Sequence, residues 1–236
     1  MLKILIFTFS FSVLSAEYGD IISRNIKNSI FGFKQTLLKK PGRTILVAGA
    51  IGTTITYQFD KDTQEWFLNN QPLPESINKF GDNYGNLYSG IIALSSAALQ
   101  SYRSKSSISF EYAFTALAVN GMTTVFIKEL AMRERPNSAD HRSFPSGHVS
   151  HSFATASILK EIFGWSIGTP AYILAMITSM NRLQDNKHYL SDVVFGASLG
   201  TAFGTGFSKV YFNNKRISIK YNPINHKVYF TYLLDT

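Results

Sequence analysis

Cysteine is absent from this chain of 236 residues, and charged residues are scarce, at 16% of the total. Without thiols the protein forms no disulfide bond and offers no cysteine ligand to zinc. The sequence contains no His-Glu-x-x-His pair and no multi-carboxylate cluster of the kind that holds paired metal ions. It therefore predicts a site that works with no metal ion and no other cofactor.

Long uninterrupted apolar runs are also few. A helix that crosses a bilayer needs about 20 mainly apolar residues, and several charge-free segments here are shorter or are diluted by Gly, Ser and Thr. The segment that starts at Val149 is interrupted by Lys160-Glu161. We therefore favour a soluble or peripheral helical domain, with integral membrane placement as the alternative. The charge-free segments are 44–59, 83–102, 112–127, 162–181 and 193–208.

The N-terminus has the shape of a signal peptide. Lys3 precedes the apolar run 4–14, and Ser15-Ala16 supplies the small residues typical of a cleavage site. We predict that residues 1–16 are a leader cleaved near Ala16, and that the protein is exported to the periplasm or cell envelope. An uncleaved anchor is the alternative.

The rest of the chain is predicted to be all-α, with one helical domain over residues 17–210 and a tail of different pattern over 211–236. Residues 18–40 mix apolar residues with lysines as an amphipathic helix does, and we expect this helix to dock on the core. The alternative is a helix lying on an anionic membrane surface. In the tail, apolar and polar residues alternate on both sides of a turn-rich centre, which predicts a β-hairpin.

Residues able to carry chemistry fall in three short clusters. In the third, His188 and Asp192 are four residues apart, which predicts that they share one face of a helix. A carboxylate that accepts a hydrogen bond from one imidazole nitrogen leaves the other nitrogen unprotonated, as a nucleophilic histidine requires. The clusters are Lys128 with Arg135-Pro136, then Pro145-Ser146-Gly147-His148, then Arg182 with His188 and Asp192.

The second cluster predicts an anion site. Pro145-Ser146-Gly147 is a turn-forming run before an apolar segment, so Ser146, Gly147 and His148 are expected at a helix N-terminus. Backbone N–H groups there attract anions. Lys128, Arg135 and Arg182 add the positive charge that phosphoryl oxygens need, and His148 is the candidate acid.

In this spacing the chain resembles the type 2 phosphatidic acid phosphatase superfamily. The family pattern is Lys, six residues, Arg-Pro; then Pro-Ser-Gly-His; then Ser-Arg, five residues, His, three residues and Asp. Every position is matched except the one before Arg182, where Asn181 stands in place of the usual serine. The motifs cover residues 110–207.

The resemblance implies a PAP2-type bundle of about six core helices and a mechanism without metal. It makes His188 the nucleophile that forms a phosphohistidine, with Asp192 orienting it. His148 would protonate the leaving oxygen and later activate water. The phosphoryl oxygens would be held by Lys128, Arg135, Ser146, Gly147 and Arg182.

We accordingly predict an exported, metal-independent phosphatase that acts on phosphate monoesters or diphosphates. The partner is a phosphorylated lipid or a small phosphate ester, with a membrane surface nearby. The net charge of +8 is dispersed and accompanies no nucleic-acid motif, so no nucleic acid is expected. The alternatives are a vanadium-dependent haloperoxidase and, because of Asn181, a non-catalytic envelope protein that binds phospholipid. The oligomeric state is not predicted.

Overall fold

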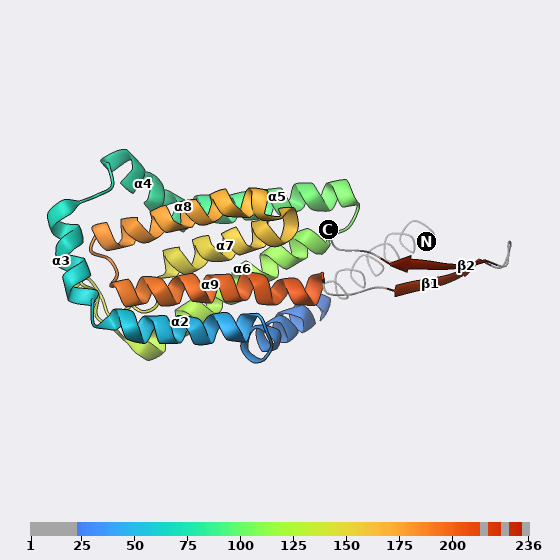
Figure 1. Ribbon diagram of the computed structural model, residues 1–236, viewed down its shortest axis with the longest axis horizontal. Helices are drawn as coiled ribbons and strands as arrows, with labels where there is room; N and C mark the ends of the chain where they lie inside the picture. Colours follow the sequence, from blue (N-terminus) through green and yellow to red (C-terminus); the bar gives the residue numbers. More distant parts are fainter. Residues whose placement is uncertain (1–22, 213–216, 223–226, 233–236) are drawn as a thin grey trace, which may run out of the picture.

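The computed structural model describes residues 23–212, 217–222 and 227–232, and Figure 1 shows their arrangement. Residues 23–212 form helices joined by loops, which confirms the all-α fold predicted from the sequence. Residues 23–38 are helical. The following elements are α2 Gly42–Tyr57, α3 Asp60–Asn70, α4 Glu75–Asn83, the π-helical turn η1 Tyr84–Tyr88, α5 Ser89–Ser104, α6 Ile108–Ala131, α7 Gly147–Phe163, α8 Trp165–Gln184 and α9 Leu190–Tyr211.

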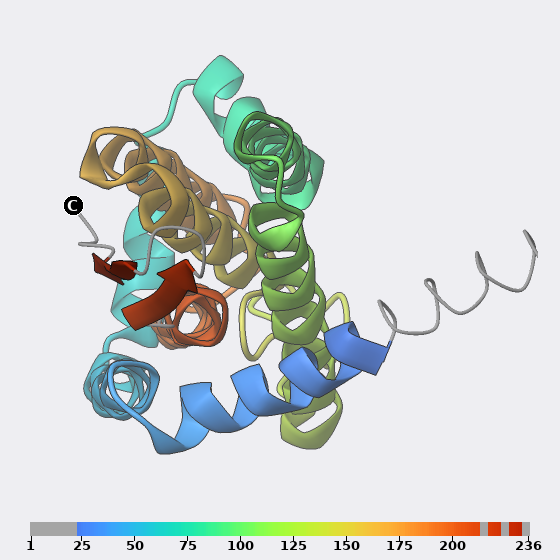
Figure 2. The same cartoon turned by 90° about the vertical axis from the view of Figure 1, so that its right-hand side faces the viewer.

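Helix α7 lies in the middle of the bundle, against α5, α6, α8 and α9. The view along the bundle in Figure 2 shows the helices side by side around it. Small residues make this packing possible, because a side-chain carbon on Gly200 of α9 would overlap the carbonyl oxygen of Ser150 on α7. Tyr112, Ile158 and Phe203 fill the core around this contact.

Gly200→Ala is expected to destabilise the protein by about 1 to 3 kcal/mol, the usual cost of overpacking. The added methyl group meets backbone atoms of α7, which cannot move aside as a flexible side chain can. The matched control is Gly121→Ala on α6, where no atom lies within 4 Å of the added carbon. Thermal unfolding followed by circular dichroism in detergent measures both. Equal midpoints for the two variants would contradict the close contact of α7 and α9.

The three sequence clusters meet at one end of the bundle. Helices α6, α7, α8 and α9 run in alternating directions, so the end of α6, the start of α7, the end of α8 and the start of α9 lie together. Lys128, Ser146, Arg182 and Asp192 belong to these four helix ends. Helix α3 crosses the same end in Figure 1. Antiparallel packing thus brings together residues that are far apart in the sequence.

Large apolar side chains cover much of the outer surface. Helix α6 is long and apolar enough to cross a membrane by length and composition, although a buried core helix can pass the same test. On α6 and on other helices, large apolar side chains are half exposed or more. Water-soluble proteins rarely expose apolar surface on this scale, so the surface favours a membrane environment over the soluble domain that we favoured. Examples are Val47, Ile51, Ile55, Ile91, Leu99, Phe114, Met122, Phe126, Ile173 and Met176.

The predicted N-terminal segments fall partly within the described residues. The leader, residues 1–16, lies outside them. In the helical residues 23–38, Phe33 packs 6.1 Å from Phe203 between ring centres, and Gly32 lies against Phe207. These contacts correspond to the docking on the core that the sequence predicts.

The tail contains two strands, β1 Ile217–Asn222 and β2 Lys227–Tyr232. They pair antiparallel, with Ile217 opposite Tyr232. Residues 213–216 and 223–226, which link the strands to α9 and to each other, lie outside the described residues. The hairpin as a separate tail unit therefore stays a prediction.

Candidate active site

Lys128 lies beside the start of α7. Its Nζ donates hydrogen bonds to the carbonyl oxygens of Arg142 at 2.5 Å and Ser143 at 3.4 Å. A side-chain carbon on Gly147 would lie 3.7 Å from Cε of Lys128. The ammonium group is thereby held next to the N-terminus of α7. The positive charge and the helix N-terminus can then attract the same anion.

The N-terminus of α7 has the form predicted from Pro145-Ser146-Gly147-His148. Ser146 is the N-cap in an extended conformation, and the helix begins at Gly147. The backbone N–H of Ser146 donates to the carbonyl oxygen of Asp192 at 3.0 Å, which ties the start of α7 to the start of α9. The hydroxyl oxygen of Ser146 is buried and has no hydrogen-bond partner within the described residues. A phosphoryl oxygen would supply that partner.

His188 and Asp192 are neighbours, but they do not share a helix as the spacing predicts. Helix α9 begins at Leu190, and His188 lies in the loop before it. The helix starts there because the Asp192 carboxylate accepts the backbone N–H of Tyr189 at 2.9 Å and so caps the first turn. The carboxylate Oδ2 lies 3.6 Å from Nδ1 of His188. The expected pair is therefore assembled by a helix cap and a loop.

The other nitrogen of His188 faces a cation. Its Nε2 lies 3.5 Å from Nη1 of Arg135. Arg135 is fixed by Asp140, whose Oδ1 accepts from Nε at 2.7 Å, and by the carbonyl oxygen of Lys187 at 3.2 Å. Since Nδ1 faces a carboxylate, we assign the proton to Nδ1. Nε2 is then the unprotonated nitrogen, whose lone pair accepts a long hydrogen bond from Arg135 and could attack as a nucleophile.

Burial lowers the pKa of His188 to about 4. The hydrogen-bonding and charge effects of Asp192 raise it, while the positive charges of Lys128 and Arg135 lower it further. The side chain is almost fully buried. The lowered pKa keeps the imidazole neutral throughout the neutral and mildly acidic range.

We expect the His188 imidazole to stay neutral down to about pH 4, whereas an unperturbed histidine takes up its proton near pH 6.5. The measurement is a pH titration of histidine-labelled protein by NMR, with the His188 signal assigned as the one missing in His188→Ala. In kinetics, the acid limb that belongs to the nucleophile should also fall near pH 4. A His188 signal that titrates near pH 6.5 would contradict the burial described here.

Arg182 is held from several sides at the end of α8. Its guanidinium donates to carboxylate oxygens of Asp82 and Asp185, the latter at 3.4 Å. It also donates from Nε to Oδ1 of Asn181 at 2.7 Å. Asn181 in turn donates to Asn78 Oδ1 at 2.7 Å. Asn181, which departs from the family pattern, is thus a buried amide that connects Arg182 to α4.

His148 lies on the other side of Asp82. Its Nε2 is 3.7 Å from the same Oδ1 of Asp82 that accepts from Arg182. Asp82 comes from α4, and its side chain is half exposed. A carboxylate oxygen therefore lies between an arginine and the candidate acid, where a phosphoryl oxygen would bind. Asp82 was not predicted as a site residue, because it lies in a polar segment with no motif around it.

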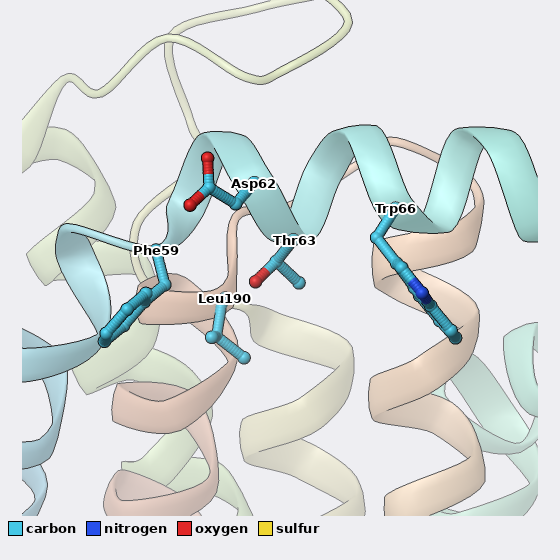
Figure 3. Close-up of a pocket in the computed structure, with 5 residues that line it drawn as sticks. All are labelled: Phe59, Asp62, Thr63, Trp66 and Leu190. Atoms are coloured by element: carbon cyan, nitrogen blue, oxygen red, sulfur yellow. The ribbon is translucent and has the colours of Figure 1, made fainter.

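Two hollows lie near this end of the bundle. One, of about 250 Å³, includes Lys128, Gly147 and His148 among its lining residues. The other, of about 420 Å³, lies under α3 and is drawn in Figure 3. In Figure 3, Phe59, Leu190 and Trp66 lie to one side of α3 and Asp62 points away from them. The second hollow has no basic lining residue, so the first is the candidate phosphate site. Its other lining residues are Gly85, Asn86, Asn120, Gly121, Thr124, Val125 and His151.

The comparisons agree with this geometry. Residues 110–216 match the model of the PAP2 superfamily, and this range contains all three clusters. Over this part of the chain, the protein is similar to the PAP2 superfamily. The fold is that of a solved PAP2 protein, the transmembrane PAP2 type phosphatidylglycerolphosphate phosphatase from Bacillus subtilis. That match has a TM-score of 0.58 and 16% identity, and covers 82% of this chain and 98% of the other.

Two curated relatives are lipid A phosphatases. The lipid A 1-phosphatase of Porphyromonas gingivalis is 34% identical over 76 residues, which are 30% of this chain and 17% of that protein. The lipid A 4'-phosphatase of Helicobacter pylori is 23% identical over 155 residues, or 61% of this chain and 77% of that protein. The match thus spans about a sixth of the first relative and most of the second.

Further residues of this site were not predicted. Arg133, Asp60 and Ser143 surround Asp192, but they lie between the motif positions or outside the motifs. Only the three-dimensional fold brings them to the site, because Asp60 and Arg133 are 73 residues apart in the sequence. Within the described residues, no group of three or more His, Cys, Asp or Glu could hold a metal ion. Metal independence itself stays a prediction.

Proposed function

We propose that this protein hydrolyses a phosphate monoester or diphosphate through a phosphohistidine on His188. The observation that carries the proposal is that a buried neutral imidazole, its carboxylate and three basic side chains lie together at one end of the bundle. Nδ1 of His188 lies 3.6 Å from Oδ2 of Asp192, and the unprotonated Nε2 lies 3.5 Å from Nη1 of Arg135.

In the first step, Nε2 of His188 attacks phosphorus and the bond to the leaving oxygen breaks. Burial lowers the pKa of His148 to about 4, and the negative charge of the bound phosphate raises it again. His148 then gives its proton to the leaving oxygen, so the leaving group departs as an alcohol or a phosphate. The imidazolium-like phosphohistidine is stabilised by Asp192 at Nδ1. Lys128, Arg135, Arg182 and the N-terminus of α7 offset the charge of the equatorial oxygens.

In the second step, water attacks the phosphohistidine. His148, which has lost its proton, takes one from this water, and the P–N bond to His188 breaks. Inorganic phosphate is released, and both histidines return to their starting protonation states. Asp82 accepts from Nη2 of Arg182, so Asp82 and the bound phosphate would share the five N–H donors of this guanidinium.

We propose a lipid-linked phosphate as the substrate and the cell-envelope membrane as the location. The curated relatives act on lipid A, and the large apolar side chains on the outer face of the bundle would contact acyl chains. The phosphate site lies at one end of the bundle, where a spanning bundle meets the headgroups. Export rests on the predicted leader, residues 1–16, and the predicted domain of residues 17–210 would carry the activity.

The test is phosphate release by the full-length protein in detergent micelles. The substrates are lipid A, phosphatidate, a polyprenyl diphosphate and p-nitrophenyl phosphate, each with and without EDTA. We expect turnover that EDTA leaves unchanged and that is higher for a lipid phosphate than for the soluble ester. Arg103→Met, an exposed arginine at the other end of the bundle, is the control variant and should match wild type.

Other outcomes would favour the alternatives. Halide oxidation that depends on added vanadate would indicate a haloperoxidase, since vanadate fits the same anion site. Phospholipid binding with no turnover of any substrate would indicate a non-catalytic protein. Loss of activity in EDTA, restored by a divalent cation, would contradict the metal-independent mechanism.

A further inference from the structure

Behind the catalytic pair, Arg133 joins two buried carboxylates. Its Nη1 donates to Oδ1 of Asp192 at 2.6 Å, and its Nη2 donates to Oδ2 of Asp60 at 2.7 Å. The face of the guanidinium lies 4.2 Å from the ring centre of Tyr189. Arg133 is therefore fixed in position and direction, with its two outer nitrogens both used.

Asp60, the first residue of α3, is tied to the start of α9. Its Oδ1 accepts the backbone N–H of Ser191 at 2.8 Å, and its Oδ2 accepts the Ser191 hydroxyl at 2.6 Å. The Asp60 side chain is only 6% exposed. The pair of Asp60 and Arg133 thus connects α3, the loop after α6 and the residues next to the catalytic carboxylate.

These contacts determine the direction in which Asp192 points. Arg133 uses Oδ1, while Oδ2 accepts from Ser143 Oγ at 2.5 Å and from the backbone N–H of Tyr189 at 2.9 Å. The Asp192 side chain is fully buried. Its Oδ2 is left 3.6 Å from Nδ1 of His188, which has no hydrogen-bond partner within the described residues. The carboxylate is therefore aimed at the nucleophile by groups that are not themselves in the site.

Charge gives Arg133 a second effect. Burial lowers the pKa of its guanidinium, but the hydrogen bonds and charges of Asp60 and Asp192 outweigh burial and raise it above its usual value. Arg133 therefore always carries the charge that offsets these carboxylates. Without it, two buried negative charges would favour a protonated His188. The other charged groups that act on His188 are Lys128 and Arg135.

We propose that Asp60 and Arg133 are positioning residues, which aim the Asp192 carboxylate at Nδ1 of His188 and do not contact the substrate. This inference rests on the proposed function, because it assigns a role behind the nucleophile of that reaction. Arg133 acts through Asp192, and Asp60 acts through Arg133 and Ser191.

The test compares Arg133→Met, Arg133→Lys and Asp60→Asn with the Arg103→Met control. We expect kcat of Arg133→Met to fall by about 10- to 100-fold, as when partners behind an active-site histidine are removed. KM should stay near the wild-type value, because no substrate contact is lost. The acid limb of His188 should move up from about pH 4, and Arg133→Lys should restore only part of kcat.

Asp60→Asn keeps the shape of the side chain and guards against misfolding of Arg133→Met. We expect it to lower kcat less than Arg133→Met does. The double variant should lose less than the two single losses combined, since Asp60 acts in part through Arg133. A lower thermal midpoint with unchanged kcat and unchanged pH profile would assign the pair a structural role only and overturn the proposal. A raised KM with unchanged kcat would also overturn it.

The outcomes separate this inference from the proposed function. If wild type turns over substrate and His188→Ala does not, but Arg133→Met equals wild type, only the inference fails. If wild type turns over none of the substrates, the proposed function fails. The inference is then decided by the NMR titration of His188, which Arg133→Met should shift to higher pH and which an uninvolved residue would leave unchanged.

Discussion

His188→Ala is expected to lower kcat for phosphate release by about four orders of magnitude or more, as when the nucleophile of a catalytic unit is removed. His188 supplies the nitrogen that bonds to phosphorus, and no other described histidine has a carboxylate at Nδ1 and an arginine at Nε2. Phosphate release is measured with the preferred substrate of wild type. The matched control is His141→Ala, an exposed histidine, which should keep wild-type activity.

The same variant gives a direct view of the covalent intermediate. Wild type quenched during turnover of radiolabelled substrate should carry acid-labile, base-stable label, and His188→Ala should carry none. Added imidazole should restore part of the activity of His188→Ala, since it can fill the space left by the side chain and attack phosphorus. Label retained on His188→Ala protein would show that the nucleophile lies elsewhere.

His148→Gln is expected to lower kcat by about 10²- to 10⁴-fold for an alkyl or sugar phosphate, the usual contribution of a general acid. The loss in the first step should be much smaller for p-nitrophenyl phosphate, because its leaving group departs as a stable anion. The measurement is the ratio of the two losses in the pre-steady-state rate of leaving-group release, which reports the first step alone. Equal losses for both substrates would contradict the assignment of His148 as the acid.

The second role of His148 can be separated in the same variant. With p-nitrophenyl phosphate, His148→Gln should release one equivalent of nitrophenol rapidly and then turn over slowly, because water is no longer activated for attack on the phosphohistidine. The size of this burst is compared with the enzyme concentration in a stopped-flow experiment. A linear time course with no burst would show that the second step does not depend on His148.

The three clusters and the helix N-terminus at Gly147 could be predicted from sequence because each depends on local spacing. The position of His188 could not be predicted in the same way. A four-residue spacing fits both a helix face and a loop followed by a capped helix, and only the hydrogen bond from Tyr189 N–H to Asp192 decides between them. Asp60, Arg133 and Asp82 depend on contacts between distant segments, which carry no local pattern.

The exposed apolar surface was underestimated for a related reason. Hydropathy along the chain is diluted by small and polar residues such as Ala97, Ser150 and Gly200. In the fold these residues are buried between helices, while larger ones such as Ile51 and Phe126 are exposed. A running average of hydropathy does not distinguish the two faces of a helix, so it reports a segment that is too polar to span even when its outer face is apolar.

The close contact between α7 and α9 extends along the whole catalytic end. Gly196, Gly200 and Gly204 follow one another at four-residue intervals on α9 and all face α7, and a side-chain carbon on Gly196 would lie 2.7 Å from the carbonyl oxygen of Ser146. The backbones of α7 and α9 are therefore in direct contact, which fixes how far apart the two helices lie. His148 follows the start of α7 and His188 precedes the start of α9, so this steric contact limits the separation of the two helix starts that carry the acid and the nucleophile.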